Sequence, residues 1–265
     1  MTILKTENRQ HRKEFKLLAN VDNIKEFNSI IKMKRLSNIR ETMFENCALK
    51  NSNMLALKKT NVVKVRMSKS DTFDFDCDIT KVSANLFAET INNLETFDFY
   101  NWDIQMNESQ LTQLFAKISK GTKLKKLEIL NDQNLSNVPQ HELAIGLNNI
   151  ANLTLMCQDI HEESEFSFEA FFNQMKMSTK MKELDIVYNN LSYLPPNLLS
   201  MSLNRVEKLN LFHTELTEAQ LLSLFESMNQ GTAIKQIDIE SHTYLQNVPP
   251  QLFASVVNNV ECANL

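Results

Sequence analysis

Glycine and proline are scarce in this chain, with three and five residues among 265. Flexible linkers and low-complexity tracts are rich in these residues, so neither is expected. Three glycines also leave little room for loops that bind phosphate groups, and the strings G-x-x-x-x-G-K and G-x-G-x-x-G are absent. The composition therefore favours one continuous core over separate domains joined by a linker.

Cysteine is sparse as well, and long apolar runs are missing. The four cysteines are scattered without C-x-x-C spacing: Cys47, Cys77, Cys157 and Cys262. Reduced thiols in a reducing compartment are the expectation, and titration of the denatured chain without reductant should find four of them. No stretch approaches the ~18 apolar residues of a membrane span, and the first residues contain no apolar run. A cytoplasmic protein without membrane contact is therefore expected.

Motifs of catalysis and metal binding are also absent. Neither G-x-S-x-G nor H-E-x-x-H occurs. Asp74, Asp76 and Asp78 have the spacing of the first ligands of a calcium loop. Such a loop next requires glycine and later glutamate, where this chain has Ile79 and Asn85. A solvated insertion explains the segment better, so we expect no enzyme activity, no cofactor and no metal.

Two short apolar phrases recur along the chain. The first is followed by proline and occurs at residues 124–129, 181–186 and 234–239. The second alternates with it at residues 94–99, 150–155 and 206–211, and begins again at 260–265. Self-similarity at such a period is typical of a solenoid, whose units bury their apolar faces by stacking on their neighbours.

Each phrase contains one predicted strand. With two further matches upstream, the strands are predicted at residues 42–44, 65–67, 97–99, 127–129, 153–155, 184–186, 209–211, 237–239 and 263–265. Their mean spacing of about 28 residues accommodates one short strand and one helix in each unit. This spacing and the L-x-x-L-x-L core resemble the leucine-rich repeats of the ribonuclease-inhibitor type over about residues 36–265.

The resemblance implies an α/β fold, a leucine-rich-repeat solenoid of horseshoe shape. About nine short parallel strands would line its concave face and helices its convex face, with the last repeat incomplete. At the position where the family usually has Asn or Cys, this chain has a mixed set of residues: Trp102, Asp132, Gln158, Asn189, Thr214 and His242. We therefore expect an irregular ladder of side chains between neighbouring repeats.

Local signals favour helices between the strands. Asn107 with Gln110, and Thr217 with Gln220, have the spacing of a capping box. Proline is tolerated at a helix start and occurs where three other helices should begin: Pro139, Pro195 and Pro249. The residue before each of these prolines should be extended and should point into the core.

The N-terminal stretch differs in charge from the rest of the chain. Residues 1–40 hold ten basic and four acidic residues, whereas the whole chain has a net charge of −4. Apolar residues at helical spacing between positions 15 and 31 predict one or two amphipathic helices. Residues 1–35 are therefore expected to form a helical cap on the repeat domain of residues 36–265. No aromatic stacking surface accompanies the basic residues, so nucleic-acid binding is not expected.

The predicted binding surface is the concave face of the strands. Alternation along each strand sends the residue between its two core positions to that face. The resulting central column contains four acidic residues: Asp98, Glu128, Asp185 and Asp238. The next column is apolar where water is expected, with Tyr188 beside it: Tyr100, Leu130, Met156, Val187 and Phe212. Apolar surface bordered by charge is typical of interfaces, although burial under the following loops is an alternative explanation.

These columns predict non-catalytic protein–protein recognition by an intracellular sensor or adaptor, the function class that the resemblance also implies. The acidic column favours a basic protein partner, and Tyr100, Phe212 and Tyr188 are the expected energetic anchors. Two alternatives remain open, a regulatory activator of an enzyme such as a small GTPase and an extracellular recognition receptor.

The chain stops within a repeat phrase. Residues 260–265 begin another unit, so the backbone groups of its strand would lack partners at this edge. We expect the C-terminal edge to pack on another chain or on missing repeats. In the isolated chain, amides of residues 263–265 should exchange faster than those of residues 184–186.

Overall fold

The computed structural model of this chain describes residues 2–7, 13–19, 39–45, 47–68, 77–100, 104–130, 135, 137–156, 167–177, 179–240 and 242–265. Two units are formed, Met1–Val138 and Pro139–Leu265, and their boundary falls inside the repeat domain predicted over residues 36–265. Each unit alternates parallel strands with helices, so the predicted α/β class is confirmed.

The first unit is built on strands that are parallel except for β1. They are β1 Thr2–Glu7, β2 Lys13–Ala19, β3 Ile39–Glu45, β4 Lys64–Ser68, β6 Thr96–Tyr100 and β8 Lys126–Leu130. β1 pairs antiparallel with β2, and each later strand pairs in parallel with the one before it. The short strands β5 Cys77–Asp78 and β7 Ile104–Gln105 form a separate pair. The helices are α2 Asn51–Lys58, α3 Ala84–Ile91 and α4 Glu108–Ile118.

The second unit repeats this arrangement. Its strands are β9 Asn152–Met156, β10 Glu183–Val187, β11 Lys208–Asn210, β12 Gln236–Asp238 and β13 Cys262–Asn264, all paired in parallel in this order. Its helices are α5 Gln140–Asn148, α6 Phe168–Met177, α7 Pro196–Leu203, α8 Glu218–Gln230 and α9 Pro250–Asn259, with a short 3₁₀ helix η4 at Leu245–Asn247.

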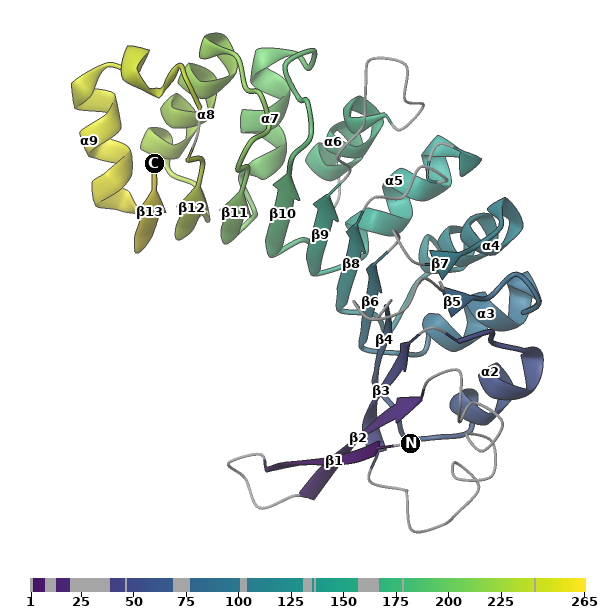
Figure 1. Cartoon of the computed structure of the whole chain (residues 1–265). Helices are drawn as coiled ribbons and strands as arrows, with labels where there is room; N and C mark the ends of the chain where they lie inside the picture. The colour runs from purple at the N-terminus through teal and green to yellow at the C-terminus, as the bar shows by residue number, and fades with distance from the viewer. Residues whose placement is uncertain are drawn as a thin grey trace. The chain divides into compact units, whose positions relative to one another are not determined.

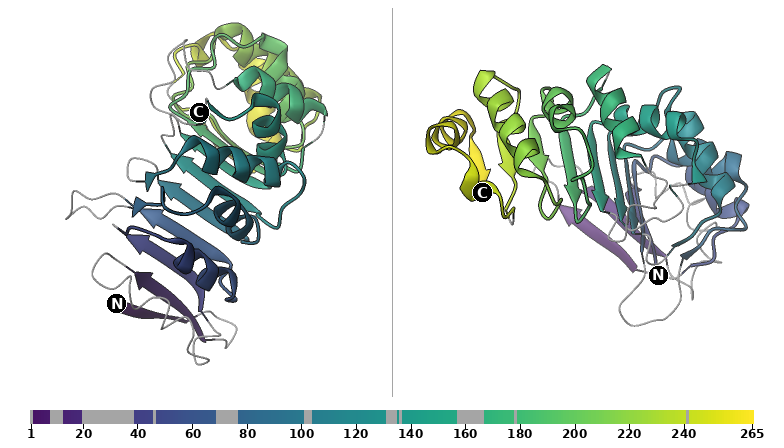
Figure 2. Two further views of the ribbon diagram at one scale, coloured as in Figure 1. Left: turned by 90° about the vertical axis from the view of Figure 1, so that its right-hand side faces the viewer. Right: turned by 90° about the horizontal axis from the view of Figure 1, so that it is seen from above.

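In each unit the described α-helices lie on one face of the strands (Figure 1, Figure 2). The other face carries none of these helices, and we call it the bare face. All nine predicted strands coincide with observed strands from β3 to β13, with bounds that differ by one to three residues at an end. The apolar phrases therefore located the strands correctly.

The N-terminal helical cap predicted over residues 1–35 is wrong for the part that the structure describes. Thr2–Glu7 and Lys13–Ala19 are strands, and β2 extends the sheet through its parallel pairing with β3. In β2 the apolar Phe15 and Leu17 alternate with Lys16, which fits the two-residue period of a strand. The rest of the predicted cap lies outside the described residues.

The predicted capping boxes are confirmed, and their glutamines also bind the preceding repeat. In α4 the Asn107 side chain accepts a hydrogen bond from the Gln110 backbone N–H, while Gln110 Oε1 accepts one from the Asn107 N–H. The buried Gln110 side chain then donates through Nε2 to the carbonyls of Ile79 and Val82, at 2.6 and 2.7 Å. One side chain thus begins its helix and satisfies two backbone acceptors of the preceding loop.

The three prolines begin helices as predicted. Pro139, Pro195 and Pro249 are the N-cap residues of α5, α7 and α9. The residues that precede them are buried, as expected: Val138, Leu194 and Val248. Proline fixes its own φ angle and restricts its neighbour to extended geometry, which aims that neighbour at the core.

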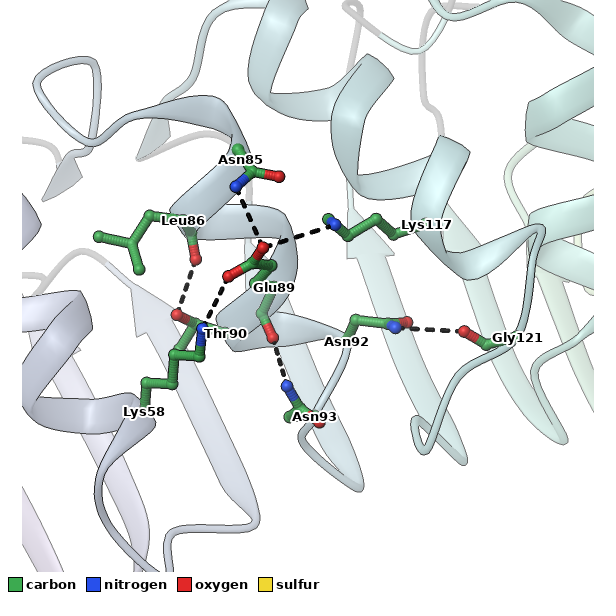
Figure 3. A network of polar contacts seen from close by, with 9 residues as sticks. All are labelled: Lys58, Asn85, Leu86, Glu89, Thr90, Asn92, Asn93, Lys117 and Gly121. Atoms are coloured by element: carbon green, nitrogen blue, oxygen red, sulfur yellow. Dashed lines mark hydrogen bonds and ion pairs between the residues drawn. The ribbon is translucent and has the colours of Figure 1, made fainter.

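Exposed ion pairs and hydrogen bonds connect neighbouring helices of the first unit (Figure 3). The Glu89 carboxylate of α3 lies 2.7 Å from Lys58 Nζ of α2 and 3.7 Å from Lys117 Nζ of α4. It also accepts a hydrogen bond from Asn85 at 3.1 Å. The hydrogen bond from Lys58, together with that from Asn85, lowers the pKa of Glu89. These pairs are exposed to water, so they contribute little to stability beyond aligning the helices.

Three cysteines lie in the described part of the chain and carry no disulfide: Cys47, Cys77 and Cys262. Cys47 and Cys77 are buried side by side, because the Cys47 N–H donates to Cys77 Sγ at 3.5 Å and Cys77 Sγ donates to the Phe44 carbonyl at 3.4 Å. Cys157 lies outside the described residues, so the expected titration of four thiols stays a prediction.

The last repeat is less buried than those before it. Val256 is the one buried residue of α9. Ala263 in β13 is half-buried, whereas its strand partner Ile237 is only 3% exposed. Greater exposure of the last strand agrees with faster amide exchange there, which stays a prediction, as does the packing of this edge on another chain.

Candidate functional site

The bare face of the second unit carries a row of polar side chains. Parallel pairing sets five residues side by side, one from each strand: Thr154, Asp185, Asn210, Asp238 and Asn264. Neighbours in such a row lie about 4.8 Å apart. All five side chains are exposed or half-buried, so the predicted alignment of Asp185 and Asp238 in one solvent-accessible row is confirmed for this unit.

Hydrogen bonds hold two carboxylates of this face together. Asn264 Nδ2 donates to Asp238 and to Glu240, both at 3.1 Å. The Glu240 backbone N–H donates to the other oxygen of Asp238 at 3.3 Å. Two negative charges therefore lie near each other at the carboxyl end of β12, where the bare face meets solvent.

The apolar row lies next to the polar row. Met156 at the end of β9 pairs with Val187 at the end of β10, and Phe212 lies two residues beyond β11. All three side chains are half-buried. Burial under the loops is thus partial, and each side chain keeps a surface that a partner can contact.

Three rings meet where β10 and β11 end, and we call them the aromatic cluster. Tyr188 stacks on His213 at a centroid distance of 5.2 Å and an interplanar angle of 15°. Phe212 packs edge-on against both, at 5.7 Å from Tyr188 and 4.2 Å from His213. The Tyr188 side chain is 42% exposed and His213 is exposed, so the cluster is a surface feature of rigidly packed rings.

The backbone of the aromatic cluster adopts a conformation that large side chains rarely take. Tyr188 has a φ of 56° and His213 a φ of 53°, and Glu215 follows with 51°. The left-handed region costs an ordinary residue roughly 1–2 kcal/mol. At the equivalent position three earlier repeats have asparagine, which tolerates this region better: Asn46, Asn101 and Asn131. Histidine also tolerates this region, so the strain is greatest at Tyr188, where a smaller residue would have a lower conformational energy.

Glu215 offers a test of this strain away from the rings. Its side chain is exposed, so we expect Glu215→Gly to raise the free energy of unfolding by about 0.5–1 kcal/mol through relief of the left-handed backbone. Chemical denaturation measures the change. The same substitution at the exposed helical Glu226 should instead destabilise by about 1 kcal/mol. A Glu215→Gly variant as unstable as Glu226→Gly would contradict the strain.

The segments behind the aromatic cluster are held by a ladder of buried side chains. Asn189 Nδ2 donates to the carbonyl of Leu155 on the preceding strand at 3.1 Å. Thr214 Oγ1 donates to the Leu211 carbonyl at 2.7 Å, and His242 Nε2 donates to the same carbonyl at 2.9 Å. The ladder is irregular in residue type, as the sequence predicted, but each of these three residues still binds a strand-end carbonyl.

His242 makes part of this ladder sensitive to acid. Burial lowers the pKa of His242, the hydrogen bond to the Leu211 carbonyl raises it, and the charge of His213 lowers it again, with a net shift downward. A histidine with a lowered folded pKa binds its proton more readily in the unfolded chain. Stability from this group is therefore complete above about pH 6.5 and falls as the pH drops below it.

Replacing His242 by Asn should remove this acid sensitivity, because Asn189 already fills the equivalent ladder position. We expect the wild-type chain to lose at most about 1.4 kcal/mol per pH unit relative to His242→Asn below about pH 6.5. Urea denaturation of both chains between pH 8 and 5 measures the difference. Parallel pH profiles of the two chains would rule out this role of His242.

Asp98 does not face solvent as predicted. Its side chain is 0% exposed and forms ion pairs with Arg66 at 3.1 Å and Lys64 at 3.5 Å. Arg66 is the strand partner of Asp98 on β4, so opposite charges meet directly across the sheet. Asp98 thus neutralises neighbours within the first unit, and its predicted exposure on a partner-steering face is wrong.

The other candidates of the first unit are less informative. Glu128 is half-buried and forms an ion pair with Lys126 of the same strand. Tyr100 pairs with Leu130 across β6 and β8, but the side chains of both lie outside the described residues. One face of the second unit therefore carries six of the predicted residues: Met156, Val187, Phe212, Tyr188, Asp185 and Asp238. Each unit is described by itself, so a binding surface shared by both units is not inferred.

His213, Glu215 and Glu240 are the site residues that sequence reasoning did not select. One usable signal was present, because asparagine at the equivalent positions in earlier repeats indicates a left-handed backbone at the end of the strand. Within the described ranges, no three His, Cys, Asp or Glu side chains are grouped to hold a metal ion. No helix in the part of the chain that the structure describes is long and apolar enough to cross a membrane.

Two comparisons with known proteins found no relative of this chain. A scan against models of protein families found no match, and a search of curated proteins found no similar sequence. The function must therefore be inferred from the bare face of the second unit and from the repeat pattern.

Proposed function

We propose that this chain is a leucine-rich-repeat protein of the ribonuclease-inhibitor type that binds a protein partner without catalysis. The nine strands, the helices on one face and the buried ladder residues all support this assignment. An intracellular adaptor or sensor fits the four scattered cysteines of the sequence. The partner binds the bare face of the second unit.

The aromatic cluster is the observation that carries the proposal. The rings of Tyr188 and His213 lie at the surface on backbone in the left-handed conformation. Asparagine or glycine would adopt this conformation at a lower conformational energy. Strain of this kind accumulates at functional sites, where the surrounding structure maintains it. Rigid aromatic rings are also the side chains that most often dominate the energy of protein interfaces.

A peptide-display selection tests the proposal without a known partner. A library of random twelve-residue peptides on phage is selected on the full chain and then screened on two variants. Peptides that bind the aromatic cluster should lose binding to Phe212→Ala and keep binding to Tyr193→Ala, which removes an exposed ring of the second unit outside the cluster. A selection whose peptides all bind Phe212→Ala as well as wild type would reject the site.

A further inference from the structure

We propose that the bare face of the second unit binds arginine side chains from a basic segment of the partner, one stacked on the aromatic cluster and another bound by the carboxylates at the end of β12. This inference rests on the proposed function and names the chemistry of its ligand. It combines the charge distribution of the second unit with the geometry of the rings and of the carboxylates at the strand ends.

Basic residues of the second unit gather where its strands begin. Three lysines at these strand starts are bound to carboxylates of neighbouring strands. Lys208 Nζ lies 2.9 Å from Glu183, while Lys182 and Lys235 lie 2.8 and 3.8 Å from Glu207. Positive and negative charge therefore balance at the starts of the strands, away from the aromatic cluster.

The charge pattern differs along the rest of these strands and the segments that follow them. Lysine and arginine are absent from residues 183–204, 209–234 and 236–265. Those three segments contain Asp185 in the middle of β10, Glu215 five residues beyond β11, and Asp238 and Glu240 at and just beyond the end of β12. The end of the sheet that holds the cluster thus carries negative charge, which attracts a cationic segment.

Ring geometry favours arginine over other cations. The Tyr188 ring stacks on His213, yet 42% of the residue stays exposed and can receive a planar guanidinium. Guanidinium groups stack on aromatic faces and donate paired hydrogen bonds to carboxylates, whereas lysine carries a compact and strongly hydrated charge. Asp238 and Glu240, held together by Asn264 at the end of β12, supply paired acceptors for a second guanidinium of the same segment.

Defined peptides test the ligand chemistry directly. Three Gly/Ser peptides of equal length, each carrying two copies of arginine, citrulline or lysine, are titrated into the isotopically labelled full chain and followed by NMR. The arginine peptide should shift the amides of Tyr188, His213 and Glu240 and bind about tenfold more tightly than the neutral citrulline peptide. Equal affinity for arginine and citrulline, or shifts confined to the strand starts, would overturn the inference. Lysine binding as tight as arginine would overturn the choice of arginine.

Two variants separate the ring from the charge. Tyr188→Leu keeps an apolar side chain but removes the π face, so the arginine peptide should bind about fivefold more weakly, with Tyr193→Leu as the control. Asp238→Asn combined with Glu240→Gln should weaken binding by a similar factor and reduce its dependence on salt. Glu207→Gln, which removes a carboxylate at the strand starts, should leave binding unchanged. Equal losses in the variants and their controls would contradict the assignment.

The outcome also separates this inference from the proposed function. Displayed peptides that require Phe212 but contain no arginine would reject the arginine site and support recognition by the bare face. Absence of any peptide that requires Phe212 would reject both.

Discussion

Replacing Gln220 by alanine should lower the free energy of unfolding by about 3 kcal/mol. The side chain is 0% exposed and makes four hydrogen bonds. Its Oε1 accepts from the N–H and the hydroxyl of Thr217, which begins α8. Its Nε2 donates to the carbonyls of Leu191 and Leu194 in the preceding repeat, at 2.7 and 2.8 Å. Alanine leaves these buried backbone groups without the bonds that Gln220 supplied.

Urea denaturation of the full chain measures this loss, with Gln230→Ala as the matched control. Gln230 is exposed at the end of α8, so its substitution should change stability by less than about 0.5 kcal/mol. A loss below about 1 kcal/mol for Gln220→Ala would show that the contact between repeats contributes little.

A second variant separates helix capping from the contact between repeats. Gln220→Glu keeps an oxygen that accepts from Thr217, but its carboxylate cannot donate to the Leu191 and Leu194 carbonyls. We expect it to be at least as unstable as Gln220→Ala at neutral pH. Protonation restores one donor, so its deficit relative to wild type should shrink at acid pH. A deficit that is independent of pH would point to capping as the main contribution.

The double variant Tyr188→Ala, Phe212→Ala should weaken partner binding by about 2 kcal/mol or more, which is about thirtyfold in the dissociation constant. Tyr188 is 42% exposed and Phe212 is half-buried, so folding should lose much less than binding. The probe is a peptide from the display selection whose binding requires Phe212. Isothermal calorimetry measures the affinity, and thermal unfolding reports the stability.

The matched control for this pair removes one ring and one flexible apolar side chain elsewhere. Tyr193 and Met201 are 51% and 46% exposed in the second unit and do not belong to the aromatic cluster. Their double replacement by alanine should leave peptide affinity within about twofold. A melting temperature that collapses in the Tyr188, Phe212 variant alone would identify these rings as core residues and refute the binding site.

Local chemistry was enough to predict much of the repeat. The apolar phrases located nine of the described strands, but not β1, β2, β5 or β7, because alternation along a strand must place an apolar residue in the core at every second position. The capping boxes at Asn107 and Thr217 and the helix starts after Pro139 and Pro195 were also predictable, since their hydrogen bonds and steric limits act over three or four residues.

The spacing of apolar residues gave a wrong prediction where it fits both the helical and the strand period. The segment around Phe15 to Leu17 allows a helix when read with the apolar residues that follow it, yet it forms β2. Pairing with β3 favours the strand over the helix, because a strand added to an existing sheet gains backbone hydrogen bonds to its neighbour. The spacing of apolar residues does not reveal this pairing.

Contacts between repeats, about 30 residues apart in sequence, decided the rest. Asp98 is buried because Arg66 lies across the sheet from it, and Cys47 lies beside Cys77 for the same topological reason. The aromatic cluster exists because β10 and β11 end side by side and turn through left-handed backbone at Tyr188 and His213. The sequence by itself determined the strands and helix starts, whose energetics are local. Tertiary structure alone decided the ring contacts of the aromatic cluster and the burial of Asp98, because the packing of neighbouring repeats sets those contacts.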